Sequence, residues 1–337
     1  MKRIFFVTNY KNIIPQKLHE TIGLDLDKLK DFLKEGFICY TISLDDLASK
    51  LLNDDEDING NYFFFTSSQI QNYKNTILDV AYDVQCRGGI LLPKYDLYKS
   101  HDNKYYQELY KSRTNVKTPH AQLLSTSNSP IKPVVPVVVK ASQGFGSKGV
   151  QLVKESGELS KSVSSLMSTY YLPLNSVDET LRRTVKYFYK YKGLYPKKIG
   201  QVVLQEFIPN LEFDWKVLVF GKSVFVLKRY VRDNDFRASG SGKFDYEISP
   251  SDELIKFAEK TRNQLDTPFV SLDIAESSNS EFSVIEFQSV HFGLATMMNA
   301  KRVFTVESGG QVNCSPVDNV CVEEYFSKSL ASYIYEK

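Results

Sequence analysis

Residues 137–153, VVVKASQGFGSKGVQLV, hold the side chains in this sequence that are best suited to binding an anion. A run of β-branched residues ends at Lys140, and the loop that follows contains Ser142, Gly144, Phe145, Gly146, Ser147, Lys148 and Gly149. Because glycine has no Cβ, its backbone N–H group can approach an anion closely, and the two lysines supply positive charge. The spacing therefore favours a site for the phosphates of a nucleotide.

The Gly144-x-Gly146-x-x-Gly149 spacing occurs in several phosphate motifs, so the flanking residues must decide between them. A dinucleotide site requires a helix after the glycines, whereas VQLV at 150–153 reads as a strand. The Walker pattern requires Lys directly before Ser or Thr, but here Lys148 precedes a glycine. The H-R-D and D-F-G companions of a protein-kinase loop do not follow. Two interpretations remain, a glycine-rich flap over phosphates and a tight hairpin turn that binds nothing.

Two acidic residues near the C-terminus lie in otherwise apolar, strand-like segments. Asp273 is in FVSLDIAE and Glu286 is in SVIEFQS. An unpaired carboxylate in such a segment is costly, so each needs a metal, a cation or solvent. Glu286 and Gln288 are two residues apart and share one face of a strand. Two carboxylates and an amide oxygen are hard ligands that suit Mg²⁺, and the alternative is a strand edge with solvated acids.

Basic residues lie between the glycine loop and these acids. Asp214 and Lys216 are in DWKVLVFG, and Arg229 ends the run KSVFVLKR. Arg237 lies among small residues in NDFRASGSG. Arginine forks match phosphate and carboxylate oxygens, so Arg237 is the leading candidate for an anion contact. A solvated charged loop is the alternative.

One further segment has the composition of an adenine site. It is a strand end before Pro209, formed by Gln205, Glu206, Phe207 and Ile208. Backbone groups there can read the edge of a base while an apolar side chain covers its face, although an ordinary strand and turn would have the same composition.

His291, just beyond the acidic strand, is a weaker candidate for a site residue that faces the acceptor substrate, because histidine also suits a strand end.

The surrounding pattern predicts the elements that must hold these residues. The first hundred residues alternate predicted strands at 3–8, 37–42, 62–68 and 90–95 with predicted helices at 24–36, 43–52 and 75–89. Such alternation predicts a small parallel sheet covered by helices. Residues 100–113 read as a helix, 116–124 as extended and 157–198 as a helical, aromatic and basic stretch. The last third reads as strands at 201–209, 214–221, 222–231, 267–276 and 282–288, with a helix at 251–265.

Length and composition narrow the class of protein. A chain of 337 residues is expected to form two or three lobes, and 42% hydrophobic with 24% charged residues is typical of a globular protein. The net charge of +2 gives no reason to expect nucleic-acid or membrane partners. Four cysteines without C-x-x-C spacing and a short N-terminal apolar run predict a cytoplasmic protein. A homodimer is the default expectation for a soluble oligomer.

Taken in chain order, the motifs resemble the ATP-grasp superfamily over about residues 98–300. Lys104 in HDNKYYQ resembles the first nucleotide lysine, and Lys140 resembles the second. SQGFGSKGV resembles the phosphate flap, QEFI resembles the adenine hinge, and DWK resembles the D-x-R/K element. The metal triplet of the superfamily is matched by Asp273, Glu286 and Gln288. The order is most similar to glutathione-synthetase and ribosomal-protein glutamylation ligases.

The resemblance implies an α/β protein, more exactly an α+β ATP-grasp fold after an N-terminal α/β domain. The expected domains are a Rossmann-like pre-ATP-grasp domain at 1–97, an ATP-grasp subdomain with the flap at 98–208, and a second subdomain with the metal site at 209–337. ATP and Mg²⁺ are the implied cofactors, with Mn²⁺ as an alternative metal. Two departures stand out, since Gln288 replaces Asn and RASGSG replaces the common R-x-N…GG.

The implied reaction is an ATP-dependent carboxylate–amine ligation through an acyl phosphate. The resemblance gives catalytic roles to Lys216, Arg229 and Arg237. The partners would be small-molecule carboxylates and amines, and one hypothesis joins an amino acid or small amine to a sugar acid in cell-surface polysaccharide synthesis. The alternatives are an ATP-grasp phosphotransferase, a non-catalytic ATP-binding module and a structural α/β protein.

Overall fold

The structure is a computed structural model that describes residues 1–16, 22–144, 149–169, 177–191, 193–307 and 309–337. The chain divides into two compact units. Unit 1 comprises Met1–His101, Tyr110–Lys117 and Leu211–Lys337, and unit 2 comprises Asp102–Leu109 and Thr118–Asn210. The three-domain division of the sequence stays a prediction.

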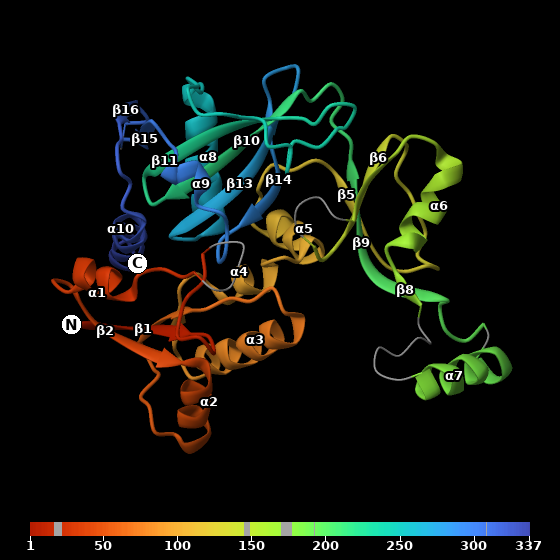
Figure 1. The fold of residues 1–337 in the computed structure, drawn as a ribbon, viewed down its shortest axis with the longest axis horizontal. Coiled ribbons are helices and arrows are strands. Elements are labelled where there is room, and N and C mark those ends of the chain that lie inside the picture. The colour runs from red at the N-terminus through yellow and green to blue at the C-terminus, as the bar shows by residue number, and fades with distance from the viewer. Residues whose placement is uncertain (17–21, 145–148, 170–176, 192, 308) are drawn as a thin grey trace. The chain divides into compact units, whose positions relative to one another are not determined.

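Unit 1 contains the parallel sheet predicted from the first hundred residues (Figure 1). Strands β1 (Lys2–Thr8), β2 (Phe37–Ser43), β3 (Tyr62–Phe65) and β4 (Ile90–Leu91) lie in the order β2-β1-β3-β4. The helices between them are α1 (Leu26–Leu33), α2 (Leu44–Asn53) and α3 (Gln71–Cys86). Ser43 caps α2, because its hydroxyl accepts a hydrogen bond from the Asp46 amide at 3.1 Å. The predicted alternation of strands and helices is confirmed.

Two predicted elements in this region have different ends. The fourth strand has two residues instead of extending over 90–95, because Pro93 has no N–H group to donate to a ladder. The helix predicted at 100–113 begins later, as α5 (Lys104–Arg113), and a short helix that was not predicted, α4 (Tyr95–Ser100), precedes it. Asp102 between them has a positive φ of 48°, which no right-handed helix contains. Asn103 then caps α5 by accepting from the Tyr106 amide at 3.1 Å.

The second sheet of unit 1 is antiparallel and has the order β14-β13-β10-β11-β15-β16, with β12 paired to β11. The strands are β10 (Phe213–Phe220), β11 (Ser223–Tyr230), β12 (Phe244–Asp245), β13 (Phe269–Glu276), β14 (Phe282–Gln288), β15 (Arg302–Val306) and β16 (Val312–Pro316). The helices are α8 (Asp252–Leu265), α9 (Ala295–Met298) and α10 (Val322–Tyr335). The predicted strands and the helix at 251–265 are present, and the segment after residue 300 adds β15, β16 and α10.

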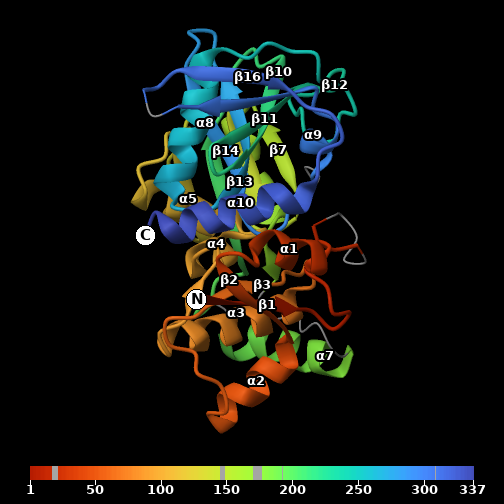
Figure 2. The same ribbon diagram turned by 90° about the vertical axis from the view of Figure 1, so that its left-hand side faces the viewer.

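Helix α10 joins the two sheets of unit 1 in one aromatic core. The ring centroid of Phe326 lies 4.7 Å from that of Phe269 and 5.0 Å from that of Phe220. Phe64, on β3, lies 5.8 Å from Phe269. Figure 2 shows α10 crossing between the parallel sheet and the larger antiparallel sheet. The N-terminal segment and the C-terminal third therefore share one hydrophobic core.

Asp266, at the end of α8, holds the C-terminal end of α10. Its carboxylate accepts hydrogen bonds from Tyr333 Oη at 3.0 Å and from Lys337 Nζ at 2.9 Å, and it also pairs with Lys94. Burial acts to raise the pKa of Asp266, but the hydrogen bonds from Lys337, Lys94 and Tyr333 outweigh it and lower the pKa.

We expect Asp266→Asn to lower the free energy of unfolding by about 1 kcal/mol at pH 7, a small effect because the site is partly exposed. Asn tolerates the left-handed backbone of this position, so the change removes charge alone. A lowered native pKa stabilises the fold above the unfolded value of about 4, and that stability is lost as the pH falls through the native pKa. Urea unfolding at pH 7 and pH 3, with the exposed pair variant Asp31→Asn as control, measures the difference. An equal loss at both pH values would contradict this account.

Unit 2 is built on a smaller antiparallel sheet in the order β5-β9-β6-β7, with β8 paired to β9. Its strands are β5 (Ala121–Thr126), β6 (Val137–Ala141), β7 (Val150–Val153), β8 (Ser168–Thr169) and β9 (Lys198–Glu206). Strand β7 confirms that the glycine loop leads into a strand. The stretch predicted as helical at 157–198 contains α6 (Ser156–Ser165), β8, α7 (Val177–Lys186) and the π-helical turn η1 (Tyr187–Tyr191). Within the described ranges, no helix is long and apolar enough to cross a membrane.

Candidate active site

One face of the large sheet of unit 1 carries a row of charged side chains. Asp214 on β10 lies directly opposite Arg229 on β11, and Lys216 on β10 lies opposite Asp273 on β13. Asp273 in turn lies opposite Glu286 on β14. Directly paired residues point to the same side of a sheet, as do residues two apart on one strand. The strand register therefore brings five of the predicted site residues onto one surface.

Four of these side chains form a continuous chain of ion pairs. Arg229 donates from Nε and Nη2 to the two carboxylate oxygens of Asp214 at 2.7 and 2.8 Å. Arg229 Nη2 also lies 3.0 Å from Asp273 Oδ2, while Lys216 Nζ lies 2.7 Å from Asp273 Oδ1. Two cations thus balance two anions. Because a buried ion pair is costly unless it is fully satisfied, loss of any one of these side chains would leave its neighbours without a partner.

The surroundings shift the pKa values within this network. Burial acts to raise the pKa of Asp273, but the charges of Arg229 and Lys216 outweigh it and hold that pKa well below its usual range. Burial raises the pKa of Asp214, and Arg229 offsets this only in part. Burial also acts to lower the pKa of Arg229, yet Asp273 and Asp214 raise it above the ordinary value. Arg229 and Asp273 are therefore a fixed cation and a fixed anion.

The predicted metal ligands continue this row along β14. Gln288 Nε2 lies 3.3 Å from Glu286 Oε1, and Gln288 Oε1 lies 2.9 Å from Nδ1 of His101. Among the described residues, no three His, Cys, Asp or Glu side chains are grouped to hold a metal, so a site here would need the amide oxygen of Gln288. Two carboxylates and an amide oxygen on neighbouring strands fit Mg²⁺ in type and register. Both carboxylate oxygens of Asp273 already contact cations, namely Lys216 and Arg229. To bind a metal, Asp273 would have to release one of these contacts or share that oxygen with the metal.

Unit 2 holds the predicted nucleotide lysines. Lys140 is buried on β6, and its Nζ donates to Oε1 of Gln205 on β9. Gln205 Nε2 donates to Oε1 of the buried Glu108 on α5 at 3.2 Å. Lys104, at the start of α5, donates from Nζ to the carbonyl of Gly144 at 2.7 Å. Both lysines are therefore held by residues of the predicted nucleotide site, Lys140 by Gln205 and Lys104 by Gly144.

Ser142 fastens the start of the glycine loop. Its hydroxyl lies 2.8 Å from Asn103 Oδ1 and 3.1 Å from Gln201 Oε1. Its carbonyl accepts from the Lys104 amide at 2.9 Å. At the far end of the loop, Gly149 has a φ of 74°, in the left-handed region that favours glycine. Four predicted loop residues lie outside the described residues, namely Phe145, Gly146, Ser147 and Lys148.

The predicted adenine segment follows the end of β9. Glu206 is exposed, and its amide donates to the carbonyl of His120 at 2.8 Å. Phe207 and Ile208 are half-buried, and Asn210 ends the segment with a positive φ of 57°. The structure thus places these residues at an accessible strand end of unit 2.

Arg237 lies in the loop between β11 and β12, so it is not on the strands that carry the other charged residues. Its guanidinium binds the Asp235 carboxylate, with Nη2 at 2.6 Å from Oδ2. The side-chain hydrogen bond to Asp235 is the main cause of the raised pKa of Arg237. An anion at Arg237 would therefore share the guanidinium with Asp235.

Reasoning from the sequence missed residues in each unit that hold the predicted site residues of that unit in place. Glu108 and Gln201 belong to no motif, and His101 and Asn103 lie in HDNKYYQ without a predicted role, so all four are recognised only through their contacts. The sequence did contain one local indication of the role of Asn103. It directly precedes α5, and asparagine is a preferred N-cap residue. The other three contacts join residues far apart in the chain, which a single sequence does not reveal.

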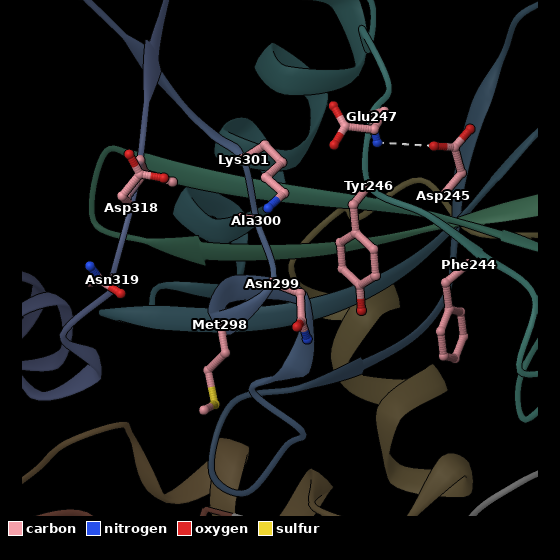
Figure 3. A pocket seen from close by; sticks show the side chains of 11 residues that line it. Phe244, Asp245, Tyr246, Glu247, Met298, Asn299, Ala300, Lys301, Asp318 and Asn319 are labelled. Atoms are coloured by element: carbon pink, nitrogen blue, oxygen red, sulfur yellow. Dashed lines mark hydrogen bonds between the residues drawn. The ribbon is translucent and has the colours of Figure 1, made fainter.

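Unit 1 also contains an open pocket of about 750 Å³. Phe244, one of its lining residues, lies on β12 directly opposite Arg229 on β11. The pocket is lined by residues 244–247, 298–301 and 317–319. In Figure 3 the side chains of Phe244, Tyr246 and Met298 point the same way, and Asp245 points away from them. The lining includes side chains of both charges, with Lys301 as its cation. Such a pocket suits a small molecule with polar groups.

Comparison with known proteins establishes the fold. No protein-family model matches the chain, and no curated protein matches it. The solved structure of D-cycloserine synthetase DcsG is similar over 98% of this chain and 99% of that chain, with a TM-score of 0.54 and 12% sequence identity. D-alanine–D-alanine ligase from Bacillus anthracis is similar over 86% and 87%, with a TM-score of 0.50 and 11% identity. The chain has the ATP-grasp fold.

Proposed function

We propose that this protein is an ATP-dependent carboxylate–amine ligase that forms an amide through an acyl phosphate. The observation that carries the proposal is the charged row on an ATP-grasp fold, in which Arg229 and Lys216 hold Asp273 opposite Glu286. Catalysis of phosphoryl transfer rests mainly on positioning and on electrostatic stabilisation. A partly buried row of paired charges has the properties that such catalysis requires.

The residues of unit 2 would hold the nucleotide. Lys104 and Lys140 would contact phosphate oxygens, with Gln205 and Glu108 keeping Lys140 in place. The strand end formed by Glu206, Phe207 and Ile208 would receive adenine. The glycine loop would cover the phosphates and exclude water, which would otherwise hydrolyse an acyl phosphate.

The residues of unit 1 would carry the reacting groups. Asp273, Glu286 and Gln288 would hold Mg²⁺ or Mn²⁺, which when bound neutralises charge on phosphate oxygens. Lys216 and Arg237 would stabilise the charge that develops during transfer, as would Lys140 of unit 2. Arg229 would fix the position of Asp273.

The proposed reaction has two balanced steps. A carboxylate oxygen of one substrate attacks the γ-phosphorus of ATP, and ADP leaves with the pair of electrons of the broken P–O bond. The amine nitrogen of the second substrate then attacks the acyl carbon, inorganic phosphate leaves, and the nitrogen loses a proton. Amino acids or small amines as acceptors, and sugar acids as donors, remain the working hypothesis.

A screen of ADP and phosphate release tests this function. Wild-type protein with ATP and Mg²⁺ is mixed with amino acids paired with carboxylates, including uronic acids. We expect at least one pair to release phosphate only when both members are present. A stable phosphorylated product that forms without an amine would instead favour a phosphotransferase.

The pocket beside β12 is the proposed contact region for one of the small substrates. The ring centroids of Tyr246 and Phe244 lie 6.5 Å apart at its edge. We expect Tyr246→Ala to raise the KM for that substrate about fivefold, because an aromatic contact contributes about 1 kcal/mol. The KM for ATP should change less than twofold, and Tyr246→Phe should resemble wild type. A rise in the KM for ATP alone would show that the pocket serves another purpose.

The four free cysteines agree with a reducing compartment, so a cytoplasmic location is part of the proposal. A homodimer also remains part of it.

A further inference from the structure

Gln288 occupies the position where the ATP-grasp resemblance expects Asn, and both ends of its amide make contacts. Oε1 lies 2.9 Å from His101 Nδ1, and Nε2 donates to Glu286 Oε1 at 3.3 Å. The end of the amide that faces Glu286 is therefore an NH₂ group. An NH₂ group is a donor without acceptor capacity, so in this orientation it repels a cation held by Glu286.

Rotating the amide by half a turn about its terminal C–C bond exchanges the two ends. Oε1 would then lie beside Glu286, and Nε2 would donate to Nδ1 of His101. That arrangement requires Nδ1 to accept, which places the proton of a neutral imidazole on Nε2. The tautomer of His101 and the direction of the Gln288 amide are therefore coupled.

His101 is fixed well enough to control this choice. Its backbone amide donates to the carbonyl of Tyr98 at 3.2 Å, and its carbonyl accepts from the buried Lys74. Its ring stacks on that of His291, with centroids 5.9 Å apart and an interplanar angle of 26°. Both histidines are buried. The ring therefore presents Nδ1 to Gln288 from a position set by several independent contacts.

We propose that His101 is a positioning residue that turns the amide oxygen of Gln288 toward Glu286 when a divalent metal binds. The inference rests on the proposed function, since it assumes that Glu286 and Gln288 hold that metal. Glutamine has one methylene more than asparagine, which lengthens the arm that carries the amide. A residue that orients a metal ligand typically changes metal affinity by about 10- to 100-fold when it is replaced.

A double-mutant cycle on metal affinity tests the proposal without a substrate. Mn²⁺ binding in the presence of ADP is measured by electron paramagnetic resonance for wild type, His101→Phe, Gln288→Ala and the double variant. We expect His101→Phe to weaken Mn²⁺ binding about tenfold. Because His101 acts only through Gln288, it should add nothing to Gln288→Ala. His101→Gln, whose Oε1 can accept a hydrogen bond, should restore most of the affinity.

A spectroscopic measurement on the intact protein covers the case in which a variant does not fold. Nitrogen-15 spectra of histidine-labelled wild type should show Nδ1 of His101 without a proton once Mg²⁺ and ADP are bound. A protonated Nδ1 in that complex, or a His101→Phe variant that binds Mn²⁺ like wild type, would overturn the inference alone. Wild-type protein that binds no Mn²⁺ with ADP would overturn the proposed metal site itself.

Discussion

Replacing Asp273 by Asn is expected to lower turnover by about 10³-fold, the largest catalytic effect of any substitution in the charged row. The change removes the anion that Lys216 and Arg229 hold at 2.7 and 3.0 Å. It also leaves the buried Arg229 and the partly buried Lys216 with one fewer partner, which should lower the free energy of unfolding by about 3 kcal/mol. Turnover and urea unfolding are measured on the same preparation, so that lost activity can be separated from lost folded protein.

Glu276→Gln provides a matched control for Asp273→Asn. Glu276 is on the same strand, but it accepts from Trp215 Nε1 at 2.9 Å on the opposite face of the sheet. Glutamine keeps an oxygen that can accept this hydrogen bond, so turnover should remain within about twofold of wild type. If folded Asp273→Asn turned over ATP within a few-fold of wild type, the charged row would not be the reaction centre.

Lys140→Met is expected to weaken ADP binding by about 10- to 100-fold, which corresponds to the loss of one charge-assisted hydrogen bond of about 1.5–3 kcal/mol. Lys140 is buried in unit 2, and its Nζ donates to Gln205 Oε1, so the position of its charge is set by the fold. Methionine retains most of the apolar length of lysine, which limits the change in packing. Calorimetric titration with ADP measures the affinity.

Lys154→Met is the matched control for this variant, because Lys154 is an exposed residue directly after β7 in the same unit. Its ADP affinity should equal that of wild type. Equal affinities for Lys140→Met and wild type would remove Lys140 from the nucleotide site and leave the glycine loop without its principal cation.

The sequence predicted the strands of the site better than the contacts between them. Runs of β-branched and aromatic residues around Asp214, Asp273 and Glu286 were sufficient to predict three strands. Residues two apart on a strand could also be assigned to one face. Which residues lie opposite one another depends on strand register, and no local pattern sets it. The Lys216–Asp273 contact, across 57 positions, therefore became visible only in the structure.

Local backbone conformation explains most of the errors in the predicted elements. The positive φ of Asp102 delays the helix predicted at 100–113 until Lys104 and separates it from α4, which was not predicted. Helix α10 follows the last motif and lacked an obvious role, yet Phe326 lies at the centre of the core. The contact between His101 and Gln288 spans 187 positions, so the orientation of the amide could not be inferred from the sequence.

The fate of the carboxylate oxygen tests the central proposal most directly. Once a productive pair of substrates is known, the carboxylate is labelled with oxygen-18 and the released phosphate is analysed by mass spectrometry. The proposal predicts that each phosphate carries one labelled oxygen, that its release requires the amine, and that Asp273→Asn abolishes it. Phosphate without label, or a labelled phosphorylated product that accumulates without any amine, would contradict ligation through an acyl phosphate.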